Sequence, residues 1–438
     1  MSQAAHFEAP PHGFRTFVIL WASQSVSVFG SALTWFAVTI WLIETRYRLE
    51  SQKPELALTL TAMGLTYIIT LALTPFAGSW ADRHDRKRTM LAADVLNGLV
   101  SLTLMSLMIS GTLETWSLIL LMASFAAISP FHHAAFDTSY AMIVPEKQLP
   151  RANGMMQTIW SLSTVVSPAI AAGIIALPEL ARQGIIPGFV GDYLRTLSDG
   201  AALAIGVDGV TFLFAALVLA FLNVPSPRHT EQHVEGAPRR GKVWSDIRLG
   251  VAYIRRRPPL LWLLVTFTVI NFASAPIELF IPLLLKFNLA ADWQSLGLSI
   301  ETSLATVATV GRIGGVIGGV LMSAWGGLKG RKVYGVVVPI LIAGVVQVVY
   351  GLSGALYLTA AMNFLFLALI PIMNSHSQTI WQTQVPREVQ GRVFAVRRVI
   401  AQFSGPIGML MAGIAGAQLN PGWILAVLGA VVVVFAAF

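Results

Sequence analysis

The feature that most constrains this chain is a series of twelve apolar runs, most of them long enough to cross a membrane. A helix needs roughly 20 mostly apolar residues to span the hydrocarbon core of a bilayer. Charged residues make up 11% of the chain, against about 25% in an average soluble domain. We therefore predict an all-α integral membrane protein with twelve transmembrane helices. The runs cover residues 17–43, 57–80, 91–110, 116–141, 152–177, 201–222, 259–286, 301–325, 334–352, 356–384, 393–418 and 422–438.

The basic residues are distributed unevenly between the two sides that twelve spans create. With a cytoplasmic N-terminus, 22 of the 29 Lys and Arg residues fall in inner segments, as they do in membrane proteins generally. We expect a multi-pass protein of the cell membrane, of the bacterial inner-membrane type, with both termini in the cytoplasm. The first 16 residues carry no signal-peptide pattern, so the first span is expected to be retained. Orientation and contacts with membrane lipids then explain the net charge of +8, and nucleic acid is not an expected partner.

The chain is predicted to consist of two related halves. Residues 223–258 are rich in Pro, Gly and charge and read as a cytoplasmic linker between residues 1–222 and 259–438, each with six spans. The stretch "VPEKQLPRANG" in the first half is echoed by "VPREVQGR" in the second. Pseudo-symmetric six-helix halves are typical of secondary transporters, whose halves rock about a central site.

The stretch "GSWADRHDRKR" resembles the loop signature that the major facilitator superfamily places between its second and third helices. The stretches "FGSALTWFAVTIW", "IVPEKQLPRANGMMQTIWSLSTVVSPAIAAGI" and "GRVFAVRRVIAQFSGPIGMLMAGI" are similar to the macrolide-efflux-type exporters of that superfamily. The resemblance implies a secondary active transporter that exports hydrophobic or amphipathic small molecules, such as macrolide-like drugs, by proton antiport with alternating access. Export of a native metabolite or siderophore, or a non-transporting receptor, are the alternatives.

The resemblance also implies a conformational latch made of charged residues at the inner ends of the helices. Asp82 and Arg86 stand four positions apart, which is close enough to pair at a helix end. The alternative is that the loop's cations only follow the positive-inside rule. Gly327 occupies the place of Asp82 in the second half, so a second latch is expected to be weak or absent. The residues carried over from the family's pattern are Gly78, Asp82, Arg83, Arg86, Lys87 and Asp137.

Ionisable residues inside the spans are candidates for proton coupling, because such residues are unfavourable in a bilayer unless they have a function or a partner. Glu278 shares a helical stripe with Asn271, and Arg312 is its nearest partner by depth, either for coupling or for a structural ion pair. Asp208 is the third candidate, with structural pairing as the alternative. The histidines that could relay a proton, if they are not simply packed, are His132, His133 and His376.

A drug pocket also needs a few polar and aromatic groups. The candidates chosen by helix face are Gln24, Ser31, Trp35, Asn271, Asn363, Asn374 and Trp381. Small residues at Gly311, Gly315 and Gly319 are expected to let that helix approach a neighbour closely.

The sequence indicates no enzyme and no cofactor. It has no Cys, its His residues lack metal-ligand spacing, and neither "GRIGG" nor "GLKGRK" follows a strand as a nucleotide-binding loop would. The expected partners are a small-molecule substrate, protons and membrane lipids, and the expected state is a monomer.

Overall fold

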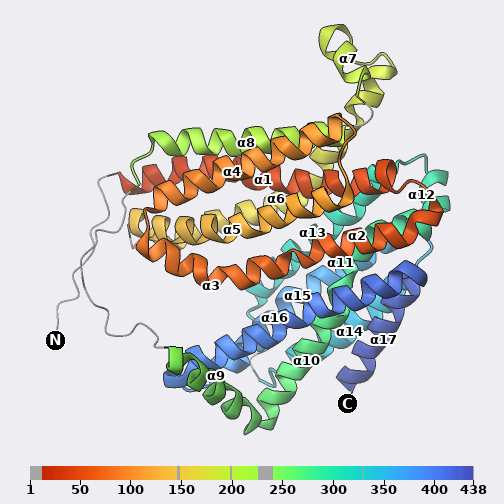
Figure 1. Ribbon diagram of the computed structural model, residues 1–438. Coiled ribbons are helices and arrows are strands. Elements are labelled where there is room, and N and C mark those ends of the chain that lie inside the picture. Colours follow the sequence, from red (N-terminus) through yellow and green to blue (C-terminus); the bar gives the residue numbers. More distant parts are fainter. Residues whose placement is uncertain (1–11, 146–147, 198–199, 225–239, 329, 438) are drawn as a thin grey trace. The chain divides into compact units, whose positions relative to one another are not determined.

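The computed structural model describes residues 12–145, 148–197, 200–224, 240–328 and 330–437, and the regular structure in this part of the chain is helical (Figure 1). A few side chains within these ranges, including that of Asp82, lie outside the description. The helices are α1 (Gly13–Trp41), α2 (Lys53–Leu65), α3 (Tyr67–Arg83), α4 (Arg86–Ile109), α5 (Thr115–Ile143), α6 (Leu149–Arg182), α7 (Gly188–Arg195), α8 (Ala201–Phe221), α9 (Arg240–Arg255), α10 (Pro258–Ser274), α11 (Pro276–Phe287), α12 (Ala290–Ser295), α13 (Ile300–Trp325), α14 (Tyr334–Leu352), α15 (Leu356–Gln384), α16 (Arg387–Gln418) and α17 (Pro421–Ala437).

Within the described ranges, eleven helical segments are long and apolar enough to cross a membrane, and α17 is a shorter apolar helix of 17 residues. The all-α multi-pass architecture is therefore confirmed, with the twelfth span shorter than the others. Two of the spans are each built from two helices. The second span is interrupted at Thr66, between α2 and α3, and the seventh at Ala275, between α10 and α11. Pro276 explains the second break, because proline lacks an N–H and is favoured at the first position of a new helix.

The first of two compact units comprises residues 1–48 and 65–229, with helices α1 and α3 to α8. Helix α8 packs against α1 and α4, α5 packs against α3 and α4, and α6 packs against α1. Gly30 permits the close approach of α1 to α8, since a Cβ atom there would meet the Asp208 carboxylate. The apolar core at one end of the unit contains Phe17, Leu20, Met90, Phe136, Ile143 and Leu219.

The second unit comprises residues 49–64 and 230–438, so α2 belongs to it although α3 belongs to the first. Thr61 of α2 lies against Gly413 of α16, and Lys53 at the start of α2 donates a hydrogen bond of 2.7 Å to the carbonyl of Leu419. The other main packings in this unit join α13 to α15, α14 to α17, and α10 to α16.

The close approach of α13 to α15 uses only part of the expected glycine row. A Cβ atom at Gly314 would collide with the backbone of Phe364, and one at Gly318 with the backbone of Ala368. A Cβ atom at Gly319 would meet nothing within 4 Å. The row Gly311, Gly315 and Gly319 was thus right at Gly311, where a Cβ atom would meet Asn363 of α15, and wrong at its third position.

Part of the expected linker is helical. Helix α9 lies within residues 223–258 and packs on α16, and the hydroxyl of Tyr253 donates a hydrogen bond of 3.3 Å to the carbonyl of Gln384. Residues 225–239 lie outside the described part of the chain. The division into residues 1–222, 223–258 and 259–438 stays a prediction.

A polar cavity in the first unit

The first unit contains a cavity of about 410 Å³ between α1, α4, α5, α6 and α8. Its lining combines aromatic rings with polar side chains, and among the described residues that line it there is no Lys or Arg. The aromatic residues are Trp21, Phe136, Trp160 and Phe212, and the polar residues are Gln24, Ser25, Ser27, Ser31, Asn97, Ser129, His132, His133 and Asp137.

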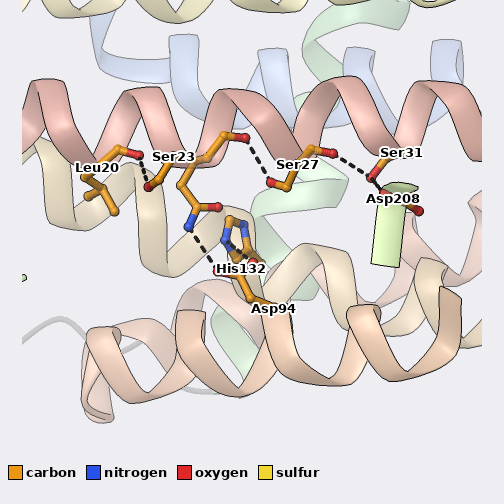
Figure 2. A network of polar contacts seen from close by, with 8 residues as sticks. Leu20, Ser23, Ser27, Ser31, Asp94, His132 and Asp208 are labelled. Atoms are coloured by element: carbon orange, nitrogen blue, oxygen red, sulfur yellow. Dashed lines mark hydrogen bonds and ion pairs between the residues drawn. The ribbon is translucent and has the colours of Figure 1, made fainter. Parts of the chain in front are cut away.

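Asp94 of α4 lies behind this lining and is fully buried. Its Oδ2 accepts a hydrogen bond of 3.0 Å from the side-chain amide of Gln24 on α1. Its Oδ1 lies 3.2 Å from Nε2 of His132 on α5 (Figure 2). The carboxylate thus joins two lining residues from two other helices. Sequence reasoning missed Asp94, although it is an ionisable residue inside the apolar run 91–110 and the rule that selected Asp208 applied to it equally.

Four buried polar atoms around this junction lack a hydrogen bond. They are Oε1 of Gln24, Oδ1 of Asp94, Oδ1 of Asn97 and Nε2 of His132. Asp94 and His132 are within ion-pair distance, but their geometry does not make a hydrogen bond. Because buried polar groups are nearly always satisfied, such a group of unsatisfied atoms calls for an explanation. Three of the four are oxygens that can only accept, and the fourth, Nε2 of His132, donates or accepts according to the tautomer of the ring.

Asp208 of α8 forms a second buried carboxylate site in the same unit, and here the oxygens have donors. Oδ2 accepts hydrogen bonds from the hydroxyls of Thr34 at 2.6 Å and Ser101 at 2.9 Å. Oδ1 lies 3.5 Å from the hydroxyl of Ser31, at the edge of the cavity (Figure 2). Asp208 therefore ties α8 to α1 and α4, which favours the structural alternative for this residue.

His133 and Asp137 both line the cavity, as neighbouring residues on the same face of α5. The His133 ring lies 5.7 Å from the ring of Trp160 on α6 and 5.8 Å from the ring of His132. Asp137 therefore lies where a substrate in the cavity could reach its carboxylate. Its expected role in the latch stays a prediction.

The signature loop connects α3 to α4 and ties helix ends together. Arg86 is buried and donates hydrogen bonds to the carbonyls of Ala81 at 3.1 Å and Thr138 at 3.0 Å. Lys87 donates a hydrogen bond of 2.8 Å to the carbonyl of Ala220, at the end of α8.

The other residues of the signature differ in their contacts. Asp85 caps α4 by accepting a hydrogen bond of 2.8 Å from the backbone N–H of Arg88. Arg83 is exposed, and a Cβ atom at Gly78 would meet nothing within 4 Å. The side chain of Asp82 lies outside the described residues, so its pairing with Arg86 stays a prediction.

In the second unit, the structure brings Glu278 and Arg312 together. Nη2 of Arg312 lies 2.5 Å from Oε1 of Glu278. His376 is held on both sides: Nδ1 is 2.8 Å from the carbonyl of Ile372, and Nε2 accepts the N–H of Leu328 at 2.9 Å. A proton relay through His376 would have to break one of these contacts.

The remaining pocket candidates lie in different surroundings. Asn271 donates a hydrogen bond of 3.0 Å to the carbonyl of Ala401, and Asn363 is buried with a bond of 3.0 Å to the carbonyl of Val307. Trp381 is fully buried in a core cluster of its unit. Trp35 and Asn374 are exposed. Of the seven candidates, Gln24 and Ser31 line the described cavity.

Comparisons with known proteins agree on the class of protein. The chain is 25% identical over 402 residues to macrolide efflux protein A of Streptococcus pyogenes, covering 91% of this chain and 88% of that protein. It is 23% identical over 410 residues to the multidrug efflux pump Tap of Mycolicibacterium fortuitum, covering 90% and 88%. Its structure resembles that of a bacterial homologue of the human lysosomal transporter Spinster, with a TM-score of 0.66 and 14% identity, covering 98% and 96% of the two chains. The family pattern of the Major Facilitator Superfamily matches residues 20–409, and this chain therefore belongs to the Major Facilitator Superfamily.

Proposed function

We propose that this transporter exports amphipathic small molecules of the macrolide-like drug class, by proton antiport across the cell membrane. The observation that carries the proposal is the cavity of the first unit, where aromatic walls surround a group of polar side chains with a buried carboxylate behind them. Its volume of about 410 Å³ is within the range of roughly 300–1,000 Å³ found for small-molecule sites. The similarity to efflux proteins over nine-tenths of the chain supports export as the direction.

The cavity's chemistry fits an amphipathic cargo. Trp21 and Trp160 offer apolar surface that does not require a fixed geometry of hydrogen bonds. Asp137, together with the absence of Lys and Arg from the described lining residues, favours a cargo that is neutral or positively charged. The signature loop is proposed to act as the latch of alternating access, since Arg86 and Lys87 join the ends of α3, α4, α5 and α8.

Transport into proteoliposomes, with and without an imposed pH gradient, tests this proposal. We expect accumulation of a radiolabelled macrolide that depends on the gradient and stops when an ionophore removes it. Trp160→Ala should raise the apparent KM, because the cavity loses one wall. Trp116→Ala is the matched control, since Trp116 of α5 is 69% exposed and does not line the cavity. Equal effects of the two substitutions would contradict the assignment of the cavity.

A further inference from the structure

The side chain of His132 lies between the cavity and Asp94. Its Nε2 is buried and lies 3.2 Å from Oδ1 of Asp94. The side chain is nevertheless 13% exposed, and the residue lines the cavity. The accessible part of the imidazole is therefore on its other edge. An imidazole placed in this way can take up a proton at one nitrogen and release another proton from the second.

The two buried carboxylates of the first unit differ in the hydrogen bonds that their oxygens accept. Oδ2 of Asp94 accepts the hydrogen bond from Gln24, but Oδ1 accepts none, and in the described part of the chain no Lys or Arg pairs with this carboxylate. Both oxygens of Asp208 lie near hydroxyl donors. The junction around Asp94 has more acceptors than donors, and one added proton supplies a donor.

We propose that Asp94 binds one proton, which reaches it from the cavity through His132. Neutral His132 with its hydrogen on Nε2 accepts a proton from cavity water at Nδ1 and becomes an imidazolium. It then gives the Nε2 proton to Oδ1 of Asp94 and is again neutral, now with its hydrogen on Nδ1. The carboxylate becomes a carboxylic acid, and the charge of the junction changes from −1 to 0.

The charged and titratable groups around His132 affect the proton transfer from His132 to Asp94. The titratable groups facing it are Asp94 of α4 and, on its own helix, His133 and Asp137. Helices α1 and α6 contribute uncharged side chains at the cavity, Gln24 and Trp160. The carboxylate of Asp137, on the cavity side, stabilises the transient imidazolium. The coupling of this proton to cargo rests on the proposed function, but the proton site itself does not.

Difference infrared spectroscopy of the whole protein in lipid nanodiscs tests the site without any substrate. Acidification should produce the carbonyl band of a buried carboxylic acid, and Asp94→Asn should remove this band. Asp208→Asn is the matched control, because it removes the other buried carboxylate of the unit and should leave the band in place. If Asp94→Asn does not fold, Asp94→Glu should shift the band instead. A difference band that Asp94→Asn leaves unchanged, or that does not move in Asp94→Glu, overturns the proposal.

The shuttle is tested by the rate at which the band appears after a rapid drop in pH. His132→Ala should slow it by about 100-fold, the usual order for losing a positioned proton-transfer group. Free imidazole added to the buffer should restore the rate, which a purely structural role of His132 would not predict. An unchanged rate in His132→Ala, or no rescue by imidazole, would remove His132 from the path.

Separate outcomes distinguish this site from the proposed function. If wild-type transport in proteoliposomes ignores the pH gradient, proton antiport is wrong, yet the infrared band still decides whether Asp94 binds a proton. If transport follows the gradient and the Asp94 band is absent, antiport stands and its proton is bound elsewhere.

Discussion

Nη2 of Arg312 on α13 lies 2.5 Å from Oε1 of Glu278 on α11, although 41% of the arginine side chain and 65% of the glutamate side chain are exposed. An exposed ion pair contributes only about 0.2–1 kcal/mol to stability. We therefore expect Glu278→Gln to lower the stability in detergent by no more than this amount, as measured by the midpoint of thermal unfolding. A much larger loss, restored by adding Arg312→Met, would indicate that the pair is desolvated in the folded transporter.

The hydroxyl of Thr34 should contribute measurably to the stability of the first unit. Thr34→Val keeps the shape of the side chain but removes the donor 2.6 Å from the buried Asp208 carboxylate. We expect a loss of about 1–3 kcal/mol in the free energy of unfolding, the range for a buried acceptor that loses its partner. Thr103→Val is the control, because Thr103 is exposed on α4 and its hydroxyl donates a hydrogen bond within its own helix, to the carbonyl of Leu99. Similar losses in both variants would contradict the role of Asp208 as a tie between helices.

The glycine contact between α13 and α15 predicts a position-dependent effect of a single methyl group. Gly314→Ala should destabilise the second unit by about 1–3 kcal/mol, because the added Cβ atom meets the backbone of α15. Gly319→Ala should be neutral or raise the stability by up to about 1 kcal/mol, since alanine favours helices over glycine and space is free there. Unfolding of both variants in the same detergent provides the comparison, and equal effects would place the helix contact elsewhere.

Arg86 should not tolerate replacement by lysine. Its guanidinium reaches the carbonyls of Ala81 and Thr138 at the same time, which one ammonium group on a flexible chain does not reproduce. Arg86→Lys is expected to lower both thermal stability and transport. Arg88→Lys is the control for stability, because Arg88 is exposed on the same helical turn. If Arg86→Lys unfolds at the wild-type temperature, the guanidinium does not hold these helix ends together.

The orientation predicted from the basic residues can be measured with single cysteines, because the chain contains none of its own. A cysteine at the exposed position Thr112 should react with an impermeant maleimide on intact cells. A cysteine at the exposed position Arg331 should react only after the membrane is permeabilised. The reverse pattern would invert the topology.

Length and hydropathy were sufficient to predict the spans, because crossing a bilayer requires a minimum number of apolar residues whatever the helices pack against. They did not predict the break at Thr66, which no proline marks. The pairing of Glu278 with Arg312 followed from similar depth in neighbouring spans, and the structure contains it. Periodicity could not show which glycine row faces α15. Gly314 and Gly315 are adjacent, and the rotation of α13 about its own axis decides which of them meets α15.

The candidate site was only partly predictable. Gln24 and Ser31 were selected by helix face, and His132 and His133 as titratable residues inside a span. All four line the cavity. Asp94 could have been selected by the same rule as Asp208. The contacts of Asp94 with Gln24 and His132 could not have been predicted. They join three helices from separate parts of the sequence, and a single sequence does not show which helices are in contact.

The membership of α2 in the second unit has a consequence for dissecting the protein. The chain passes between the units near Leu49, again near Gly64, and a third time near His229, so the sequence halves are not interchangeable with the structural units. A fragment that ends before the linker would retain α2 without its α16 neighbour, leaving Thr61 without the surface at Gly413. Separately expressed halves should consequently be recovered as a co-folded pair and poorly as single polypeptides.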